Sequence, residues 1–490
     1  MSTAPSEAER PKGRGYSLAI PLIVAGAFFM QNIDSSLIAT ALPSMAESLH
    51  EDTLRLNLAI TAYLLSLAIF IPVSGWMSDR FGARRVFRAA ILMFTLGSVL
   101  SGLANTLPEL ILFRFLQGIG GAMMVPVGRA VLLRAVPKNE LLRAMTFLTM
   151  PALLGPVLGP PLSGLIVTYL SWRWIFFINL PIGIIGAVLV TWLLKEVREE
   201  NVGPLDVRGF ALSGLGLAGL MFGFEAVGRS NLPVWLIVCI VSAGAILIAL
   251  YVIHAARTQA PIIDFRLLHI PTFRTAAIAG SLFRIAAGAV PFLLPVMLQV
   301  GFGLSPLTSG MITFATAIGA LSLRPVAAPI VRRFGFRRLL IGNAVINGAF
   351  FVGYALFTPE TPHLVLVGAL LFGGFFRSLQ LTSMNTMGYA DIPQPGMSRA
   401  SSFASMVQQL AQSLGVSVGA LVLHVTVVLR HGDGLSPADF WPAFVTVGLV
   451  SLLSIPAFMA LPRDAGAEVS GHRGRAATRA ARKGDNTPVA

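Results

Sequence analysis

Apolar stretches long enough to cross a lipid bilayer recur along the whole chain, and they constrain its fold more than any other feature. A hydrocarbon core about 30 Å thick needs roughly 20 apolar residues in helical conformation. We find fourteen such stretches, at approximately 18–41, 56–77, 87–105, 110–133, 144–168, 174–194, 209–228, 234–255, 275–300, 307–330, 339–358, 364–388, 400–428 and 440–461. The sequence therefore predicts an all-α integral membrane protein with fourteen transmembrane helices.

The composition excludes several classes of protein. Charged residues make up only 12% of the 490 residues, whereas soluble proteins carry roughly 25%, so a large soluble enzyme is excluded. The net charge is +14, but the basic residues lie in short loops between apolar stretches. They form no continuous basic face, so we expect no nucleic-acid partner. The single cysteine, Cys239, excludes an intramolecular disulfide and a cysteine cluster for a metal.

The distribution of Lys and Arg predicts the orientation of the chain in the membrane. An even number of spans places both termini on one side. One set of loops, together with the two tails, holds 27 Lys and Arg, whereas the other set of loops holds 4. Because basic loops stay in the cytoplasm, we expect a multi-pass membrane protein with both termini cytoplasmic. The first span has no convincing cleavage site, so we interpret it as a retained helix and not a signal peptide.

A repeated motif predicts that the chain has two similar halves. DRFGARRV at 79–86 returns as RRFGFRRL at 332–339, which is 253 residues later. We expect two six-helix bundles with two additional helices between them. The expected parts are an N-terminal cytoplasmic tail (1–17), a first bundle (18–194), a linker with two additional transmembrane helices (195–274), a second bundle (275–461) and a basic, disordered cytoplasmic tail (462–490).

Acidic side chains within the predicted spans are the first candidates for a functional site. Glu225 lies about one turn from the outer end of its span, where it can reach water. Asp34 lies about 10 Å below the outer end of the first span at about 1.5 Å per residue, a depth at which an ionisable group is costly unless it is paired or faces a cavity. Arg114 lies at a comparable depth in the fourth span.

The pairing of these two residues suggests a proton site. Burial favours the neutral form of a carboxyl group, and a guanidinium group nearby favours the ionised form. A site that opens and closes to water can therefore load and release a proton. We predict that Asp34 is the proton-coupling residue and that Arg114 modulates it. A permanent structural ion pair is the alternative.

Two arginines of the second half lie near the expected bilayer midplane. Arg284 and Arg377 are too deep in their spans for their side chains to reach the interface easily. We expect them to line a central substrate cavity together with Gln31, Tyr63, Gln117 and Gln380. Gln31 lies three positions before Asp34, and Gln117 three positions after Arg114, so each pair shares a helix face. The alternative is that these arginines bind backbone carbonyl groups of bent helices.

The charge balance of the spans also bears on the substrate. The predicted spans contain five basic and two acidic residues. Their interior is therefore positive, which suits an anionic or neutral substrate better than a cation.

The loop after the second span is a candidate conformational gate. In GWMSDRFGARR at 75–85, a carboxylate is surrounded by arginines, and charge-assisted hydrogen bonds between them can hold one bundle against the other. An ordinary cytoplasmic basic loop is the alternative interpretation. The expected gate residues are Gly75, Asp79, Arg80, Gly82, Arg84, Arg85 and Arg129.

A second candidate element for conformational change lies in the fifth span. Prolines bend a helix, and glycines let a neighbouring helix approach. We therefore expect a hinge and seal between the bundles, formed by Gly155, Pro156, Gly159, Pro160, Pro161 and Gly164.

Motifs for nucleotide binding or hydrolysis are not supported. Gly214, Gly216 and Gly219 match a dinucleotide-binding pattern, but they lie in an apolar span and follow no strand. Walker A and H-E-x-x-H sequences do not occur. We therefore expect neither an enzyme nor a metal site.

Several motifs resemble those of the major facilitator superfamily, specifically its fourteen-helix drug:proton antiporter family of the EmrB/QacA type. They are the loop motif at 75–85, DSSLIATALP at 34–43, LFRFLQGIGGA at 112–122, GPVLGPPLSG at 155–164 and WRWIFFINLPIG at 172–183. FFMQNID at 28–34 and GGAMMVPVGR at 120–129 are similar to its MdtD-like branch. The second copy of the loop motif departs from the pattern, because Arg332 stands where the first copy has Asp79.

The resemblance implies a fold and a function. It implies a proton-coupled efflux transporter that exports drugs or other small amphipathic compounds by alternating access; export of a specific organic anion, organic acid or metal chelate is the alternative. The family's first-span acid and fourth-span arginine match Asp34 and Arg114, and the motif at 155–164 marks antiporters in the family. Protons are the expected coupling ion, and no cofactor is expected. The expected location is the bacterial inner membrane. The expected partners are a small-molecule substrate and the lipid bilayer; the protein is expected to work as a monomer, and a periplasmic adaptor or outer-membrane partner is left open.

Overall fold

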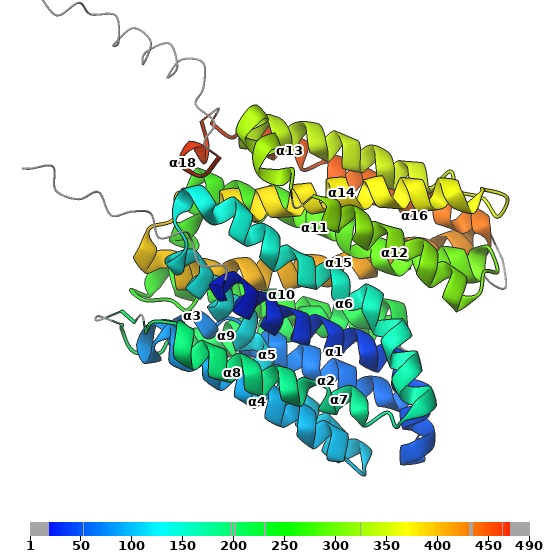
Figure 1. Ribbon diagram of the computed structural model, residues 1–490, viewed down its shortest axis with the longest axis horizontal. Helices are drawn as coiled ribbons and strands as arrows, with labels where there is room; N and C mark the ends of the chain where they lie inside the picture. The colour runs from blue at the N-terminus through cyan, green and yellow to red at the C-terminus, as the bar shows by residue number, and fades with distance from the viewer. Residues whose placement is uncertain are drawn as a thin grey trace, which may run out of the picture.

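The computed structural model describes residues 19–470 except 52, 197, 200, 201, 230, 231, 324, 431–434 and 463. Within these residues the regular secondary structure is entirely helical (Figure 1). The first group comprises α1 (Ala19–Leu49), α2 (Thr53–Phe70), α3 (Ser74–Phe81), α4 (Ala83–Leu103), α5 (Leu107–Ala135), α6 (Leu141–Tyr169), α7 (Trp174–Phe177) and α8 (Asn179–Leu193). Between the groups lie α9 (Val207–Arg229) and α10 (Val234–Arg257). The second group comprises α11 (Pro271–Val296), α12 (Pro306–Ser322), α13 (Ala327–Tyr354), α14 (His363–Gly388), α15 (Met397–Leu429), α16 (Phe440–Leu452), α17 (Ile455–Met459) and α18 (Ala467–Ser470).

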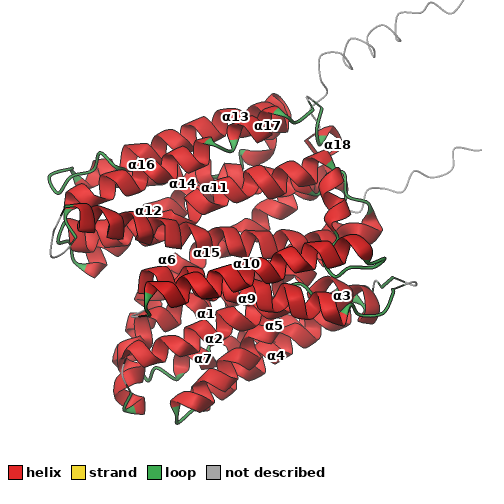
Figure 2. Cartoon of the chain, turned by 180° about the vertical axis from the view of Figure 1, so that it is seen from behind, coloured by secondary structure: helices red, strands yellow, loops and turns green. Residues whose placement is uncertain are grey.

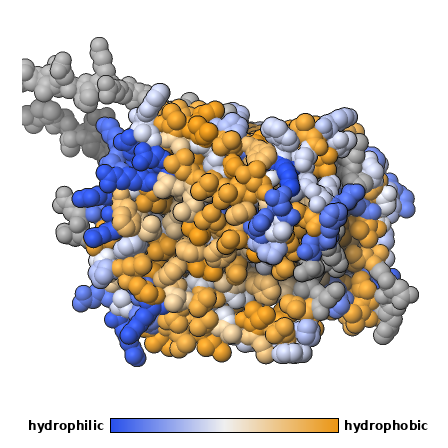
Figure 3. Space-filling view, turned by 90° about the horizontal axis from the view of Figure 1, so that it is seen from below, coloured by the Kyte–Doolittle hydropathy of each residue, from blue (hydrophilic) through white to orange (hydrophobic). Residues whose placement is uncertain are grey.

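The helices have the length and composition of membrane spans. In the described residues, ten helical segments are long and apolar enough to cross a membrane, or up to twelve if each of two bent pairs is one span. The expected spans 144–168 and 339–358 correspond to α6 and to the part of α13 after Gly335, so each expected span has a helical counterpart. Apolar side chains cover the middle of the face in Figure 3, and hydrophilic side chains gather toward its ends. The prediction of an all-helical membrane protein is confirmed.

The sequence repeat produces the same backbone bend in both halves. Gly82, between α3 and α4, has φ +94°, and Gly335, within α13, has φ +71°. Residues with a Cβ rarely adopt positive φ, so the glycine of each copy allows the chain to turn there. A second bend precedes each motif, by 58° between α2 and α3 and by 83° between α12 and α13.

The two groups form two bundles with α9 and α10 against their junction (Figures 1 and 2). In the first bundle α1 packs against α6, and α5 against α2 and α4. In the second bundle α11 packs against α15, α12 against α14, and α13 against α16. α9 contacts α2 of the first bundle and α15 of the second. The start of α1 and the short helix α18 lie at the same end of the molecule in Figure 1.

The glycine motif of α9 serves helix packing. A Cβ on Gly244 of α10 would lie 2.8 Å from the backbone nitrogen of Leu220 and 2.9 Å from the carbonyl oxygen of Gly216. A Cβ on Gly219 would lie 3.3 Å from the Cα of Gly244. The glycines that mimic a nucleotide motif therefore let α9 and α10 approach closely.

One expectation about the C-terminal tail is wrong. Residues 464–470 of the segment expected to be disordered include α18, and Val469 of that helix is buried. Gly466 packs against the ring of Phe336, and Lys138 forms an ion pair with Glu468 at 2.6 Å. This part of the tail is anchored because α18 packs against α13 of the second bundle and against α6 and the turn at Lys138–Glu140 of the first. Residues 1–18 and 471–490 lie outside the described residues.

Candidate functional site

The centre of the first bundle contains a buried carboxylate with three hydrogen-bond donors. Asp34 of α1 is fully buried, and its Oδ2 accepts a hydrogen bond from Arg114 Nη1 of α5 at 2.7 Å. Its Oδ1 accepts from Gln117 Nε2 and from Asn179 Nδ2, each at 2.9 Å. A buried charge is tolerated only when it is paired and hydrogen-bonded, and these donors meet that requirement. The structure thus brings the predicted proton-coupling residues together.

Arg114 is held on several sides. It is the largest fully buried side chain in the described residues. Its Nη1 also donates to Gln117 Oε1 at 2.6 Å, and its guanidinium carbon lies 4.4 Å from the centre of the Tyr63 ring. A cation over an aromatic face is stabilised by the ring quadrupole. The guanidinium group therefore keeps favourable contacts that do not depend on Asp34.

One member of the cluster was predicted in the wrong place, and one was missed. Gln117 does not line the cavity, because its amide is bonded to Asp34 and Arg114 and its side chain is fully buried. Asn179, at the start of α8, was not predicted. Besides its bond to Asp34, it donates to Ser98 Oγ at 2.9 Å. A polar residue between apolar neighbours in the motif at 172–183 was the available signal.

Glycines of α6 allow the close packing of α1 next to Asp34. A Cβ on Gly155 would lie 2.7 Å from the Cβ of Asn32, and a Cβ on Gly159 would collide with the side chain of Ser36. Asn32 and Ser36 flank Asp34 along α1. A Cβ on Gly164 would meet nothing within 4 Å, so the expectation that Gly164 serves close helix contact is wrong. The side chains of Pro156 and Pro160 lie outside the described part of the structure.

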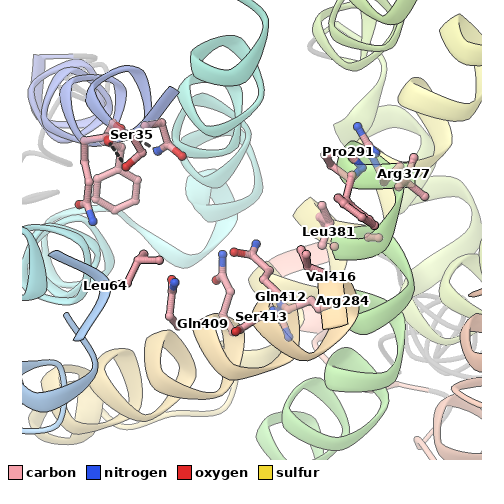
Figure 4. Close-up of a pocket in the computed structure, with 18 of the residues that line it drawn as sticks. Ser35, Leu64, Arg284, Pro291, Arg377, Leu381, Gln409, Gln412, Ser413 and Val416 are labelled. Carbon is pink, nitrogen blue, oxygen red and sulfur yellow. Dashed lines mark hydrogen bonds between the residues drawn. The ribbon is translucent and has the colours of Figure 1, made fainter. Parts of the chain in front are cut away.

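A cavity of about 1300 Å³ lies between the two bundles (Figure 4). Its walls come from α1, α2, α5 and α6 of the first bundle, α11, α12, α14 and α15 of the second, and α9. Of the residues expected there, Gln31, Tyr63, Arg284 and Arg377 line it. Gln380 does not line the cavity. It is fully buried, where its Oε1 accepts from Asn343 Nδ2 of α13 at 2.8 Å, and this bond turns its amide away.

The cavity is cationic and has no acidic lining residue in the described structure. Arg129, Arg284 and Arg377 line it, and none of its described lining residues is Asp or Glu. Asp34 and Arg114 are also absent from the lining, because Tyr63 lies between Arg114 and the cavity. Within the described residues, no group of three or more His, Cys, Asp or Glu is placed to hold a metal ion.

Hydrogen bonds across the two bundles gather at the end where α18 lies. Ser74 of α3 bonds Ser402 of α15 through their hydroxyl groups at 2.7 Å. A Cβ on Gly75 would lie 2.9 Å from Ser402 Oγ and 3.1 Å from the carbonyl oxygen of Ser398, so Gly75 permits this contact. The expected gate residue Gly75 therefore lies at the interface between the bundles.

Arg129 forms a second contact between the bundles. Its Nη1 donates to the Tyr389 hydroxyl at 3.3 Å and to Ser405 Oγ at 3.4 Å, and its Nη2 donates to Gln408 Oε1 at 3.3 Å. All three acceptors belong to the second bundle and are neutral. Arg129 therefore joins the bundles beside the cavity, and none of these acceptors neutralises its charge.

The ion pair of Asp79 lies within the first bundle, and its carboxylate also interacts with the Ser398 side chain of α15 in the second bundle. Its Oδ1 accepts from Arg134 Nη2 of α5 at 3.1 Å, and the same Nη2 donates to Glu199 Oε1 at 3.0 Å. Arg134 and Asp79 both belong to the first bundle, and Glu199 belongs to the linker that follows it. Sequence reasoning missed Arg134, because it lies 55 residues after Asp79.

The arginines next to Asp79 have other partners. Arg80 is exposed on α3. Arg84 donates to the carbonyl oxygen of Thr191 in α8, and Arg85 lies 3.5 Å from Glu196. The bend at Gly82 gives α4 a new direction, so its first arginines face α8 and the linker instead of the carboxylate.

Comparison with known proteins shows to which family this chain belongs. The sequence model described as Major Facilitator Superfamily matches residues 24–416 and also residues 276–483. The chain is 40% identical over 440 residues to a protein of Pectobacterium atrosepticum that carries the multidrug resistance name MdtD, covering 90% of this chain and 93% of that protein. The chain belongs to the major facilitator superfamily.

Other superfamily members agree with this assignment. An MdtD protein of Salmonella dublin is 36% identical over 451 residues, covering 90% of this chain and 94% of that protein. The human organic anion transporter MFSD10 (TETRAN) shares the fold with a TM-score of 0.65 at 15% identity, covering 90% and 99% of the two chains. The proton:xylose symporter XylE has a TM-score of 0.63 at 17% identity, covering 93% and 98%. The expected superfamily fold and the likeness to MdtD are confirmed; the protein is a multi-pass membrane transporter of small molecules and not an enzyme.

Proposed function

We propose that this transporter exports small amphipathic compounds in exchange for protons, from the cytoplasm across the bacterial inner membrane. The observation that carries the proposal is the buried Asp34 with its three donors, beside a cavity between two bundles. Protons are the coupling ion, and no cofactor takes part. The basic loops place both termini in the cytoplasm, and the protein works as a monomer.

The chemistry of the Asp34 cluster explains how a proton changes the site. Arg114 can only donate hydrogen bonds, so its bond to Asp34 Oδ2 is an ion pair only while the carboxyl group is ionised. Protonation of Oδ2 removes the ion pair and frees the guanidinium group. Arg114 then keeps its contacts with Gln117 and with the face of Tyr63. The proton therefore loosens α1 from α5 without leaving Arg114 unpartnered.

Tyr63 connects this change to the substrate cavity. Its ring contacts Arg114 on one side, and its side chain lines the cavity on the other. Gln31, one turn before Asp34 on α1, also lines the cavity. Movement of Arg114 or α1 thus alters the cavity wall, which is the link that proton-coupled transport requires.

The bundle contacts suggest which side the cavity faces. The serine contacts at Ser74 and the Arg129 contacts lie at the end where α18 lies. With the termini in the cytoplasm, the cytoplasmic end is the closed one. Rocking of the bundles about the cavity would alternate this arrangement with an inward-open one.

The proposal is tested in inverted inner-membrane vesicles energised to acidify their interior. Uptake of ethidium and of fluorescein is measured with and without a protonophore. We expect the wild type to accumulate at least one dye in a protonophore-sensitive manner. We expect Asp34→Asn to reduce this accumulation by roughly a hundredfold, the effect of removing a proton-transferring group, while dye movement down its gradient persists. Full protonophore-sensitive accumulation by Asp34→Asn would refute the proposal.

A matched control is available in the second bundle. Asp439 is also fully buried and accepts a hydrogen bond from an arginine, Arg430, at 2.8 Å. It lies away from the cavity lining. Asp439→Asn should therefore weaken folding but leave proton coupling intact, which separates loss of a buried aspartate from loss of the proton site.

A further inference from the structure

We propose that Arg377 and Arg284 form a binding site for the acidic group of an amphipathic organic anion, a carboxylate or sulfonate attached to an apolar body. This proposal rests on the proposed function, because it assigns the class of compound that the same cavity carries. One observation supports it: guanidinium groups line the cavity, and no carboxylate among the described lining residues neutralises them.

Arg377 of α14 is the first part of the argument. It lines the cavity, and its guanidinium group makes no hydrogen bond or ion pair with any described residue. A charge within a membrane protein is costly unless it is paired or faces water in a cavity. Figure 4 places its side chain at the cavity wall beside Pro291. The group is thus free to bind an anion without breaking an internal contact.

Arg284 of α11 supplies a second, partly used guanidinium group. It is buried, lines the cavity, and donates through Nη2 to Asn385 Oδ1 and through Nη1 to the carbonyl oxygen of Ala276. Its Nε has no partner among the described residues. Both acceptors are neutral, so its charge is not cancelled. The internal bonds fix the direction of the side chain, while the charge remains available to a ligand.

The remainder of the cavity agrees with an amphipathic ligand. The only carboxylate near the first bundle's side of the cavity, among the described residues, is Asp34, and Arg114 already neutralises it behind Tyr63. Apolar side chains such as Leu64, Val416 and Leu381 share the walls with the arginines (Figure 4). A planar carboxylate can bind a guanidinium group through two parallel hydrogen bonds, and the apolar walls can take the rest of the molecule.

Two dyes with the same ring system but opposite charge test the site directly. Full-length protein in a neutral maltoside detergent is titrated at mildly alkaline pH with fluorescein, an anion, and with a cationic rhodamine ester. Fluorescence anisotropy gives the two dissociation constants. We expect fluorescein to bind at least about tenfold more tightly than the rhodamine ester, since charged hydrogen bonds are the strong ones.

Variants then assign the selectivity to the arginines. We expect Arg377→Gln to weaken fluorescein binding about tenfold and to leave rhodamine binding unchanged or improved. Arg377→Lys should recover part of the loss, because a point charge remains but the planar fork does not. Arg338→Gln removes an exposed arginine of the same bundle and serves as the control, with no expected change. Equal losses for both dyes, or unchanged fluorescein binding in both Arg377→Gln and Arg284→Gln, would overturn the proposal.

A lipid headgroup is the other source of an acidic group. Dihexanoylphosphatidylglycerol, kept below its micelle-forming concentration, is added as a competitor of fluorescein. Failure to displace the dye supports a soluble organic anion. Displacement at the dye's own concentration would assign the site to lipid and overturn the proposal as stated. Binding in detergent needs no proton gradient, so Asp34→Asn should keep the dye preference, and the two proposals can fail independently.

Discussion

The two bundles come from one repeated plan, yet their buried charges are arranged in opposite ways, apart from Arg129 of the first bundle, which also lines the cavity and has neutral acceptors. In the first bundle the charges of Asp34 and Arg114 cancel inside the protein, shielded from the cavity. In the second bundle Arg284 and Arg377 face the cavity without a carboxylate partner among the described lining residues. Helices of similar arrangement can therefore serve different roles, because the first bundle is suited to hold an exchangeable proton and the second to meet a charged ligand.

The repeat allows the two bundles to be compared position by position. At the offset of 253 residues that relates the two loop motifs, Gln31 of α1 corresponds to Arg284 of α11, and Asp34 corresponds to Ala287. Both Gln31 and Arg284 line the cavity, so one turn of each helix occupies a comparable place. The second bundle therefore carries a cation where the first carries a neutral amide, and a methyl group where the first carries its carboxylate.

Loss of the ion pair in the first bundle should have the largest consequence. Arg114→Gln leaves Asp34 buried without its cation, which typically costs about 3–5 kcal/mol of stability. A buried carboxylate without a cation favours its protonated form, so the folded variant binds a proton that the unfolded chain releases. The stability of the variant should then rise as the pH falls. Thermal unfolding across a pH series measures this.

The double variant provides the control for that prediction. Asp34→Asn combined with Arg114→Gln contains neither charge, so most of the lost stability should return and the added pH dependence should vanish. If Arg114→Gln alone proves as stable as the wild type at every pH, the pair does not hold the first bundle together.

Disruption of the close contact between α1 and α6 should have the second-largest effect. Gly159→Leu pushes a side chain into Ser36 of α1, and overpacking of this kind costs typically about 1–3 kcal/mol. Because Ser36 lies two residues from Asp34, we expect the variant to lose proton-driven dye accumulation as well as stability. Gly164→Leu is the matched control on the same helix, since a Cβ there meets nothing within 4 Å. Equal behaviour of the two variants would show that the packing of α6 on α1 does not matter for transport.

Parts of the Asp34 cluster could be predicted from the sequence because charged residues are rare within membrane spans. Asp34 and Arg114 lie at similar depths in apolar spans, and depth follows from the rise of a helix. The same reasoning placed Gln117 on the face of Arg114, which is correct, but it gave no direction for that face. The amide points to Asp34 and not to the cavity. Asn179 carries no charge, so its position between apolar neighbours in the motif at 172–183 was the only signal in the sequence that could have indicated it.

Contacts between segments that are distant in the sequence could not be predicted from adjacent residues. The motif at 75–85 offered Arg80 and Arg84 as partners of Asp79, whereas the structure supplies Arg134 from α5. Gln380 was expected in the cavity because of its depth, but Asn343 of α13 binds it. In each case a tertiary hydrogen bond decides the orientation of the side chain. Both copies of the repeat, by contrast, contain a glycine bend that a single residue with positive φ allows.

Introducing the first bundle's carboxylate into the second bundle should have the mildest consequence. Ala287→Asp places a carboxylate at the position equivalent to Asp34, three residues after Arg284, where the two side chains share a helix face. Ala287 lines the cavity, so the new charge meets the ligand as well. We expect fluorescein binding to weaken roughly tenfold and binding of the rhodamine ester to improve, because like charges across a binding site repel. Ala287→Asn has the same size without the charge and should change neither constant. A loss for both dyes in Ala287→Asp would mean that the position matters for shape, and the contrast between the bundles would then not be one of charge.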